Sequence, residues 1–221
     1  MDGTRGIITL AAAPSTLRFQ TLGIGDKIRI TDLPPWLPPG PVDRPIGDCE
    51  VRVRMAVSQV ATGASMVPAV LLRYADQSTY YRARIHFATG GGMFASITRD
   101  TTQIGGTPQL PYSYTAGAQF ELRVKLTGQL IQMRVWPTGT AEPTVWHHAE
   151  TIVTNPIASG AVGLSASAFA GMTNVNPQLL YDEFALVTPQ RFTLDRSVNG
   201  IVKAHTAGTD LRLAQPTIVA L

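Results

Sequence analysis

The chain has 221 residues, of which 44% are hydrophobic and only 15% are charged, with a formal net charge of +3. This length suits a single β domain with extensions, and it allows a core to be buried without disulfides. The 18 basic residues are scattered and form no basic run, so the sequence does not indicate binding to nucleic acid.

The single cysteine, Cys49, excludes an intrachain disulfide and a zinc cluster built from cysteines. The N-terminus lacks the basic start and apolar block of a signal peptide, and no apolar run approaches the ~18 residues of a membrane span. We therefore expect a soluble protein that is made in the cytoplasm and does not insert into a membrane.

The first segment, residues 1–46, is predicted to be an arm used in assembly. Short strands are predicted in it at residues 7–10, 17–22 and 26–30. The proline-rich run 34–41 cannot pair inside a sheet, because proline fixes φ and lacks an amide hydrogen. Trp36 and Pro38 in this run are predicted to contact neighbouring subunits; a ligand for an SH3-type domain is the alternative.

The middle block, residues 47–188, alternates polar and apolar residues between frequent glycine and proline breaks. Strands are predicted at residues 50–57, 66–74, 79–87, 93–99, 120–126, 130–136, 161–169 and 179–187. This pattern predicts an all-β fold, a two-sheet sandwich or jelly roll with N- and C-terminal β extensions. The arginines on the polar faces of these strands are interpreted as solvated, and they include Arg52, Arg54, Arg82 and Arg84.

The last segment, residues 189–221, is predicted to form its own β-hairpin. A strand at 191–196 leads into Asn199-Gly200, which is the strongest two-residue signal for a hairpin turn. We predict that Asn199 and His205 contribute to an assembly interface.

The order of several pieces in the middle block resembles concanavalin-like (laminin-G-like) jelly rolls. The pieces are residues 80–85, 122–128, 131–136, 160–164 and 181–187. The resemblance implies a concanavalin-like jelly-roll sandwich.

The two flanks resemble minor tail proteins of phages and prophages of actinobacteria. The matching stretches are residues 23–34, 191–200 and 203–209. The resemblance implies a virion tail component, made in the host cytoplasm, whose partners are other tail or virion proteins. It also implies a homo-oligomer, a trimer or a hexamer around the tail axis. Tail proteins with such flanks are usually much longer than this chain.

Four aromatic residues are the predicted glycan-binding set: Trp136, Trp146, Tyr112 and Tyr114. The two tryptophans bound a loop between strands, and aromatic faces stack on sugar rings. The alternative is that the tryptophans end strands and cap the core.

No catalytic residue, metal ion or cofactor is predicted. Glycosidases need two facing carboxylates, whereas Asp182 and Glu183, the only adjacent acidic pair, should point to opposite faces of a strand. His147 and His148 should diverge in the same way and make a poor metal site; a calcium ion bound in a loop stays open.

These observations predict a non-enzymatic structural protein of a phage tail. Its jelly roll would serve attachment to a glycan on the host surface or assembly of the tail tip. The alternatives are a free lectin-like carbohydrate-binding module and, less favoured, a glycoside hydrolase.

Overall fold

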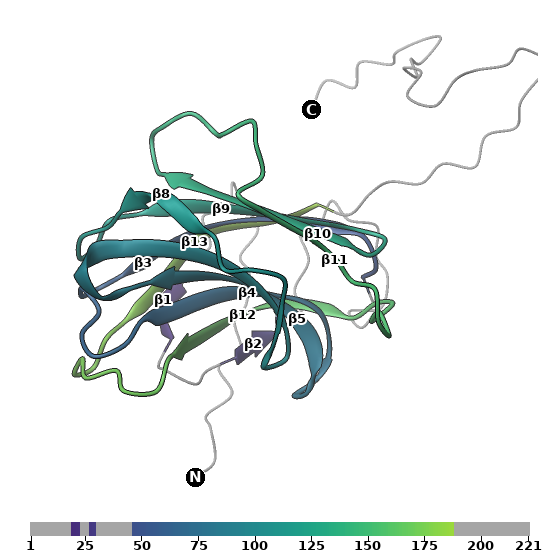
Figure 1. Cartoon of the computed structure of the whole chain (residues 1–221), viewed down its shortest axis with the longest axis horizontal. Helices are drawn as coiled ribbons and strands as arrows, with labels where there is room; N and C mark the ends of the chain where they lie inside the picture. Colours follow the sequence, from purple (N-terminus) through teal and green to yellow (C-terminus); the bar gives the residue numbers. More distant parts are fainter. Residues whose placement is uncertain (1–18, 23–26, 30–45, 188–221) are drawn as a thin grey trace, which may run out of the picture. The chain divides into compact units, whose positions relative to one another are not determined.

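The computed structural model describes residues 19–22, 27–29 and 46–187, which form two antiparallel sheets packed face to face (Figure 1). Sheet A has six strands in the order β1 (Phe19–Leu22), β13 (Leu179–Val187), β3 (Cys49–Val57), β9 (Phe120–Thr127), β10 (Leu130–Pro137) and β11 (His148–Thr151). Sheet B has seven strands: β2 (Lys27–Arg29), β12 (Ala161–Ala168), β4 (Met66–Asp76), β5 (Thr79–Phe87), β6 (Gly92–Arg99) and β7 (Thr102–Ile104), with β8 (Gln109–Ser113) also pairing with β6.

The core lies between the two sheets and is built from the apolar residues that alternate along each strand. On β9, for example, Leu122 and Val124 are fully buried against sheet B, while Arg123 and Lys125 point away from it. Successive side chains of a strand point to opposite faces, so this alternation gives each sheet one apolar inner face.

The chain crosses repeatedly between the sheets, which is the connectivity of a jelly roll. It passes from sheet A to sheet B between β3 and β4 and between β11 and β12, and it returns between β8 and β9 and between β12 and β13. The predicted all-β fold, a concanavalin-like jelly-roll sandwich, is confirmed.

The strands predicted in the middle block are all present, with ends that differ by at most two residues. Three further strands, β7, β8 and β11, were not predicted. They have three to five residues, and β8 contains Pro111, so the local pattern that marks a strand is too short in each case. A short 3₁₀ helix, η1 (Thr89–Gly91), joins β5 to β6.

Part of the first segment completes the sandwich. β1 pairs with β13, with Leu22 opposite Leu179, and β2 pairs with β12, with Ile28 opposite Leu164. The predicted strands at 17–22 and 26–30 therefore extend one sheet each. The other predictions for the flanks, including Trp36, Pro38, Asn199 and His205, lie outside the described residues.

Arg73 joins three loops at one end of the sandwich. Its side chain is 4% exposed and donates hydrogen bonds to the carbonyl oxygens of Gly47 (3.0 Å), Gly128 (2.8 Å) and Ile157 (2.6 Å) and to Asp48 Oδ1 (3.3 Å). Each of these carbonyls belongs to a different connection. No helix in the described residues has the length and apolar character needed to cross a membrane.

Candidate functional site

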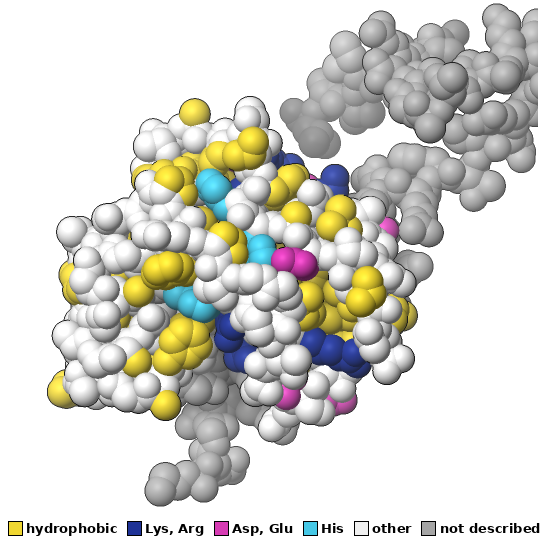
Figure 2. All heavy atoms as spheres, viewed as in Figure 1, with side chains coloured by type: hydrophobic (Ala, Val, Ile, Leu, Met, Phe, Trp, Pro, Cys, Tyr) yellow, Lys and Arg dark blue, Asp and Glu magenta, His cyan; other side chains and the backbone are white. Residues whose placement is uncertain are grey.

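The outer face of sheet B carries a row of four polar side chains along β5, which we name the β5 row: Tyr80, Arg82, Arg84 and His86. They alternate with the core residues of the same strand, as the sequence predicted. Over these seven residues a strand extends by about 20 Å, which is long enough for a short oligosaccharide. Figure 2 shows histidine, basic and hydrophobic side chains close together on the face turned to the viewer.

Arg84 and His86 meet at Ser96 of the neighbouring strand β6. Arg84 Nε donates to Ser96 Oγ (2.9 Å), and His86 Nε2 lies 2.7 Å from the same oxygen. The Nη2 group of Arg84 donates to Gln103 Oε1 (2.9 Å). Because the guanidinium can only donate, Ser96 Oγ accepts that bond and can give its own hydrogen to the imidazole.

Arg82 is held one step further along the row. Its Nε donates to Thr98 Oγ1 (3.2 Å), and its Nη2 donates to the carbonyl oxygen of Asp100. Tyr80 donates to the carboxylate of Asp100 (2.6 Å), and its ring stacks on Tyr74 with the centroids 5.5 Å apart. These bonds fix the orientation of both arginine side chains in the row.

An aromatic ring lies beside each end of the β5 row. Phe169, which follows β12 and is 41% exposed, packs edge-on against His86 at 5.0 Å, and the Arg84 guanidinium lies 5.9 Å from its ring centroid. At the other end, Arg82 lies 5.7 Å from the ring of Tyr80. The Tyr80 ring is buried (1% exposed), so the row combines hydrogen-bond donors with one exposed aromatic ring, Phe169. Saccharides are held in protein sites by such donors and rings.

Burial shifts the pKa of three groups in this row, Tyr80, Arg84 and His86. Burial and the charge of Arg84 lower the pKa of His86 to about 4, so the imidazole is neutral at pH 7. Burial and the charge of Arg82 lower the pKa of Arg84 to about 10, so this guanidinium stays protonated. The row thus presents two cations and one neutral imidazole.

The arginines of the β5 row differ from those of sheet A in having no acidic partner. Arg82 and Arg84 are 9% and 8% exposed, and no carboxylate among the described residues lies within ion-pair distance of either. The interpretation of these two side chains as solvated is wrong. Arg84 contacts Ser96, Gln103 and the ring of Phe169, and Arg82 contacts Thr98, Asp100 and the ring of Tyr80.

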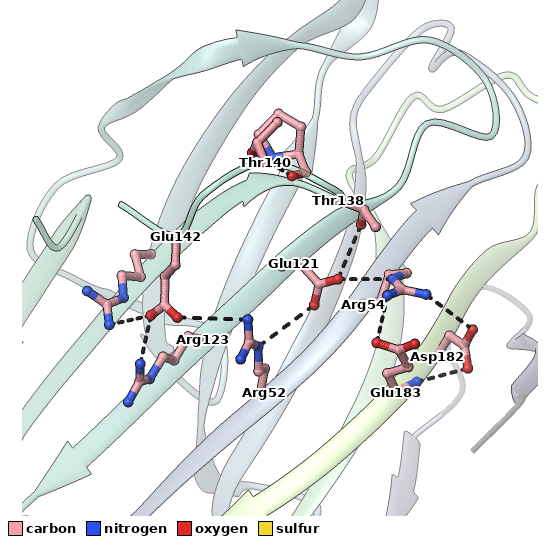
Figure 3. A network of polar contacts seen from close by, with 11 residues as sticks. Arg52, Arg54, Glu121, Arg123, Thr138, Thr140, Glu142, Asp182 and Glu183 are labelled. Carbon is pink, nitrogen blue, oxygen red and sulfur yellow. Dashed lines mark hydrogen bonds and ion pairs between the residues drawn. The ribbon is translucent and has the colours of Figure 1, made fainter. Parts of the chain in front are cut away.

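On the outer face of sheet A, by contrast, basic and acidic side chains form one network (Figure 3). Glu121 accepts a hydrogen bond from Arg54 Nε (3.0 Å), and Glu142 accepts from Arg123 Nη1 (2.7 Å) and contacts Arg134 and Arg52. Since each charge has an opposite partner, this face has a structural explanation that needs no ligand.

The acidic pair on β13 does not behave as the sequence predicted. Asp182 and Glu183 both reach Arg54, at 3.8 Å and 2.6 Å, instead of pointing to opposite faces (Figure 3). The cause is a bulge, since the register with β3 shifts between Asp182 and Ala185 and Glu183 has φ of 48°. Both carboxylates are engaged with the same arginine.

The four predicted glycan-binding aromatics do not form one exposed surface. Trp136 is 2% exposed, with Arg52 5.2 Å from its ring centroid, and Tyr114 is 3% exposed and belongs to the core. Neither ring has a face open to a sugar. Tyr112 and Trp146 are partly exposed, and the Arg134 guanidinium lies 4.4 Å from the Trp146 ring centroid. Both stay predicted contact residues.

The histidine pair and the cysteine have surroundings of their own, outside the β5 row. His147 Nδ1 accepts from the backbone of Val135 (3.1 Å), while His148 is buried with Nδ1 3.8 Å from Glu150. Burial raises the pKa of Cys49 to about 12, which keeps it a thiol. Within the described part of the chain, no group of three histidine, cysteine or acidic side chains is placed to hold a metal ion.

The sequence matches no protein-family model and no curated protein sequence. Among solved structures, it resembles a carbohydrate-binding module from Bacillus subtilis, with 9% identity over 65% of this chain and 76% of that chain and a TM-score of 0.42. It also resembles a β-glucanase from Bacillus licheniformis (11% identity, 66% and 69%, TM-score 0.45). A third is a human galectin-16 variant (9% identity, 77% and 100%, TM-score 0.43). These similarities concern the fold alone, so the site must be judged on its own residues.

The sequence did not single out the β5 row as a site. Its alternation was predicted, and two arginines followed by a histidine at every second position were visible. The signal that could have found the row is the lack of any acidic residue on the same face of the adjoining strand β6, where Ser96 and Thr98 stand instead.

Proposed function

We propose that this chain is a non-catalytic carbohydrate-binding module whose binding surface is the β5 row on the outer face of sheet B. The observation that carries the proposal is the oriented guanidinium group of Arg84 beside an exposed aromatic ring, Phe169, at one end of the row. Sugars offer hydroxyl oxygens to such donors and apolar ring faces to such aromatics.

The position of the Ser96 hydroxyl beside the His86 imidazole favours binding of a saccharide without its cleavage. A serine beside a histidine is the usual arrangement of an activated nucleophile. Ser96, however, is 0% exposed and lies beneath Arg84 and His86 on a continuous strand. Its hydroxyl orients the arginine and the imidazole and has no open side from which to attack a substrate.

A glycan array on the whole chain and on Phe169→Ala tests the binding surface. We expect the variant to lose about three- to tenfold in affinity for whichever glycan binds, because a stacking contact is removed. Val153→Ala is the matched control, since Val153 is also an exposed apolar side chain, 84% exposed, in a different loop. Equal binding by all three proteins, or no signal on the array, would sink the proposal.

The competing aromatic site is tested on the same array. If Trp146→Ala abolishes binding and Phe169→Ala does not, the surface is the loop between β10 and β11 and not the β5 row. Incubating any bound oligosaccharide with the protein, followed by mass spectrometry, checks catalysis: cleavage products would contradict a purely binding role.

We also propose that this module is part of a phage tail. The resemblance of residues 23–34, 191–200 and 203–209 to minor tail proteins supports this, and those stretches lie almost wholly outside the described residues. Light scattering at high protein concentration tests the expected trimer or hexamer; a uniform monomer that is absent from purified tail particles would contradict the tail assignment.

A further inference from the structure

We infer that the ligand of the β5 row is an acidic saccharide, and that Arg82 and Arg84 bind its carboxylate or sulfate groups. This inference rests on the proposed function and narrows it to one class of glycan. It follows from the charges on this face and not from the fold.

The two arginines are buried cations whose charge is balanced by no ion pair with a carboxylate of the described residues. Each is more than nine-tenths buried, and they stand two residues apart on the same face of β5. Their hydrogen bonds go to neutral groups: two hydroxyls, one amide oxygen and one backbone carbonyl. Removing charges from water without an opposite charge is unfavourable, so a structure that keeps two of them side by side indicates an anionic ligand.

The geometry of each guanidinium leaves donors for such a ligand. Both arginines use Nε and Nη2 within the protein, and within the described residues Nη1 of neither donates a hydrogen bond. The internal bonds hold the planar group in one orientation. A held guanidinium with a remaining N–H edge is well suited to carboxylate or sulfate oxygens, since little side-chain entropy is lost on binding.

The surroundings also favour a saccharide over a small inorganic anion. Phe169 offers an apolar ring beside Arg84, and Gln103 adds an exposed amide at the edge of the row. The acidic side chain at the far end, Asp100, accepts its bond from Tyr80. A chain of sugar rings with acidic groups can use the aromatic ring and both cations together.

The inference is tested by calorimetric titration of the whole chain with oligogalacturonate and with its methyl ester, which carries the same sugars without charge. We expect the acidic form to bind at least tenfold more tightly. Arg84→Met and Arg82→Met should each weaken that binding about 10- to 100-fold and change binding of the ester little. Arg52→Met, on the outer face of sheet A, is the matched control and should bind as the parent does.

Titrations with three further ligands show which kind of anionic group the arginines bind. Dextran sulfate against dextran reports on sulfate, and a single-stranded oligonucleotide reports on a general polyanion. Should Arg84→Met fail to fold, Arg84→Lys keeps the charge without the planar fork and should show intermediate affinity. Equal affinity for the oligonucleotide and for acidic saccharides would overturn the inference.

The outcomes distinguish this inference from the proposed function. Binding that prefers neutral glycans and depends on Phe169 would keep the carbohydrate-binding role and overturn the acidic ligand. Absence of binding to every saccharide, neutral or acidic, would overturn both.

Discussion

At the scale of single residues, Arg73 contributes more to the fold than the sequence around it suggests. It has φ of 48° within β4, next to the register shift between Leu72 and Asp76, and it donates to three backbone carbonyls from separate loops. Ordering a loop costs conformational entropy, and its buried backbone carbonyls need hydrogen-bond donors. The buried Arg73 side chain supplies such donors to three loops that have no backbone partner for these carbonyls among the described residues.

Replacing Arg73 with methionine is therefore expected to lower the free energy of unfolding by about 3 kcal/mol or more, because buried carbonyls lose their donors. Urea denaturation measures the loss. Arg99→Met is the control, since Arg99 also donates to two loop carbonyls, those of Thr154 and Asn155, but at the surface. It should cost less than about 1 kcal/mol; equal losses in the two variants would contradict this role.

Gly160 is the second residue on which this corner depends. A Cβ atom there would lie 2.4 Å from the carbonyl carbon of Arg73 and 2.7 Å from the amide nitrogen of Tyr74. Gly160→Ala should thus destabilise the protein by about 1–3 kcal/mol through forced backbone movement. Gly106→Ala, where nothing lies within 4 Å, should change the melting curve little; a similar shift for both would refute the steric explanation.

At the scale of elements, the connection between β10 and β11 is held down by the network on sheet A. Glu142 in this connection contacts Arg52, Arg123 and Arg134, and Arg134 Nη1 also donates to the carbonyl oxygen of Pro143 (2.7 Å). Burial tends to raise the pKa of Glu142, but the bond from Arg123 and the charges of the three arginines bring it below its ordinary value. The carboxylate therefore stays ionised, and its ion pairs with the three arginines hold this loop against sheet A.

Glu142→Gln should increase hydrogen exchange across residues 138–147 while lowering global stability by less than about 1 kcal/mol, since these pairs are partly exposed. Glu50→Gln removes a different partner of Arg123 without touching the loop, and it should leave exchange there unchanged. Unchanged exchange in Glu142→Gln would mean that the loop is held by other contacts.

The elements also show what the sequence could and could not predict. Strands such as β5 and β9 were predicted almost to the residue because their alternation is local. The bulge at Glu183 was not predicted, because it depends on the pairing of β13 with β3. The burial of Arg84 was not predicted either, because Ser96, Gln103 and Phe169, which contact it, belong to other strands and loops. Local patterns identify the faces of a strand, whereas burial of an outer face is decided by residues distant in the sequence.

At the scale of the whole molecule, buried histidines make stability depend on pH. Burial, with the charge of Arg84, lowers the pKa of His86 from 6.5 to about 4, and burial also lowers the pKa of His147 and His148. Below pH 6.5 the unfolded chain binds a proton at His86 that the folded chain does not. The free energy of unfolding should therefore fall as the pH falls from 6.5 to about 4. Above pH 6.5 the neutral His86 imidazole makes its full contribution to stability.

Urea denaturation at pH 7, 5 and 4 measures this dependence. From the shift at His86, the parent protein should lose on the order of 3 kcal/mol more than His86→Gln over this interval. Carboxylates such as Glu142 titrate in both proteins and cancel in the comparison. Parallel curves for the two proteins would show that His86 is not the source.

The strands β1 and β2 have a further consequence for the whole sandwich. Each of them adds one short strand to a sheet: β1 pairs with β13 at Leu179 and Tyr181, and β2 pairs with β12 at Gly163–Ser165. Strands β13 and β12 run for nine and eight residues, against four and three for the strands β11 and β7 at the opposite side. Long uncovered edges recruit strands from other molecules. The pairing of β1 and β2 therefore shortens the edge of each sheet that could pair with a strand of another molecule.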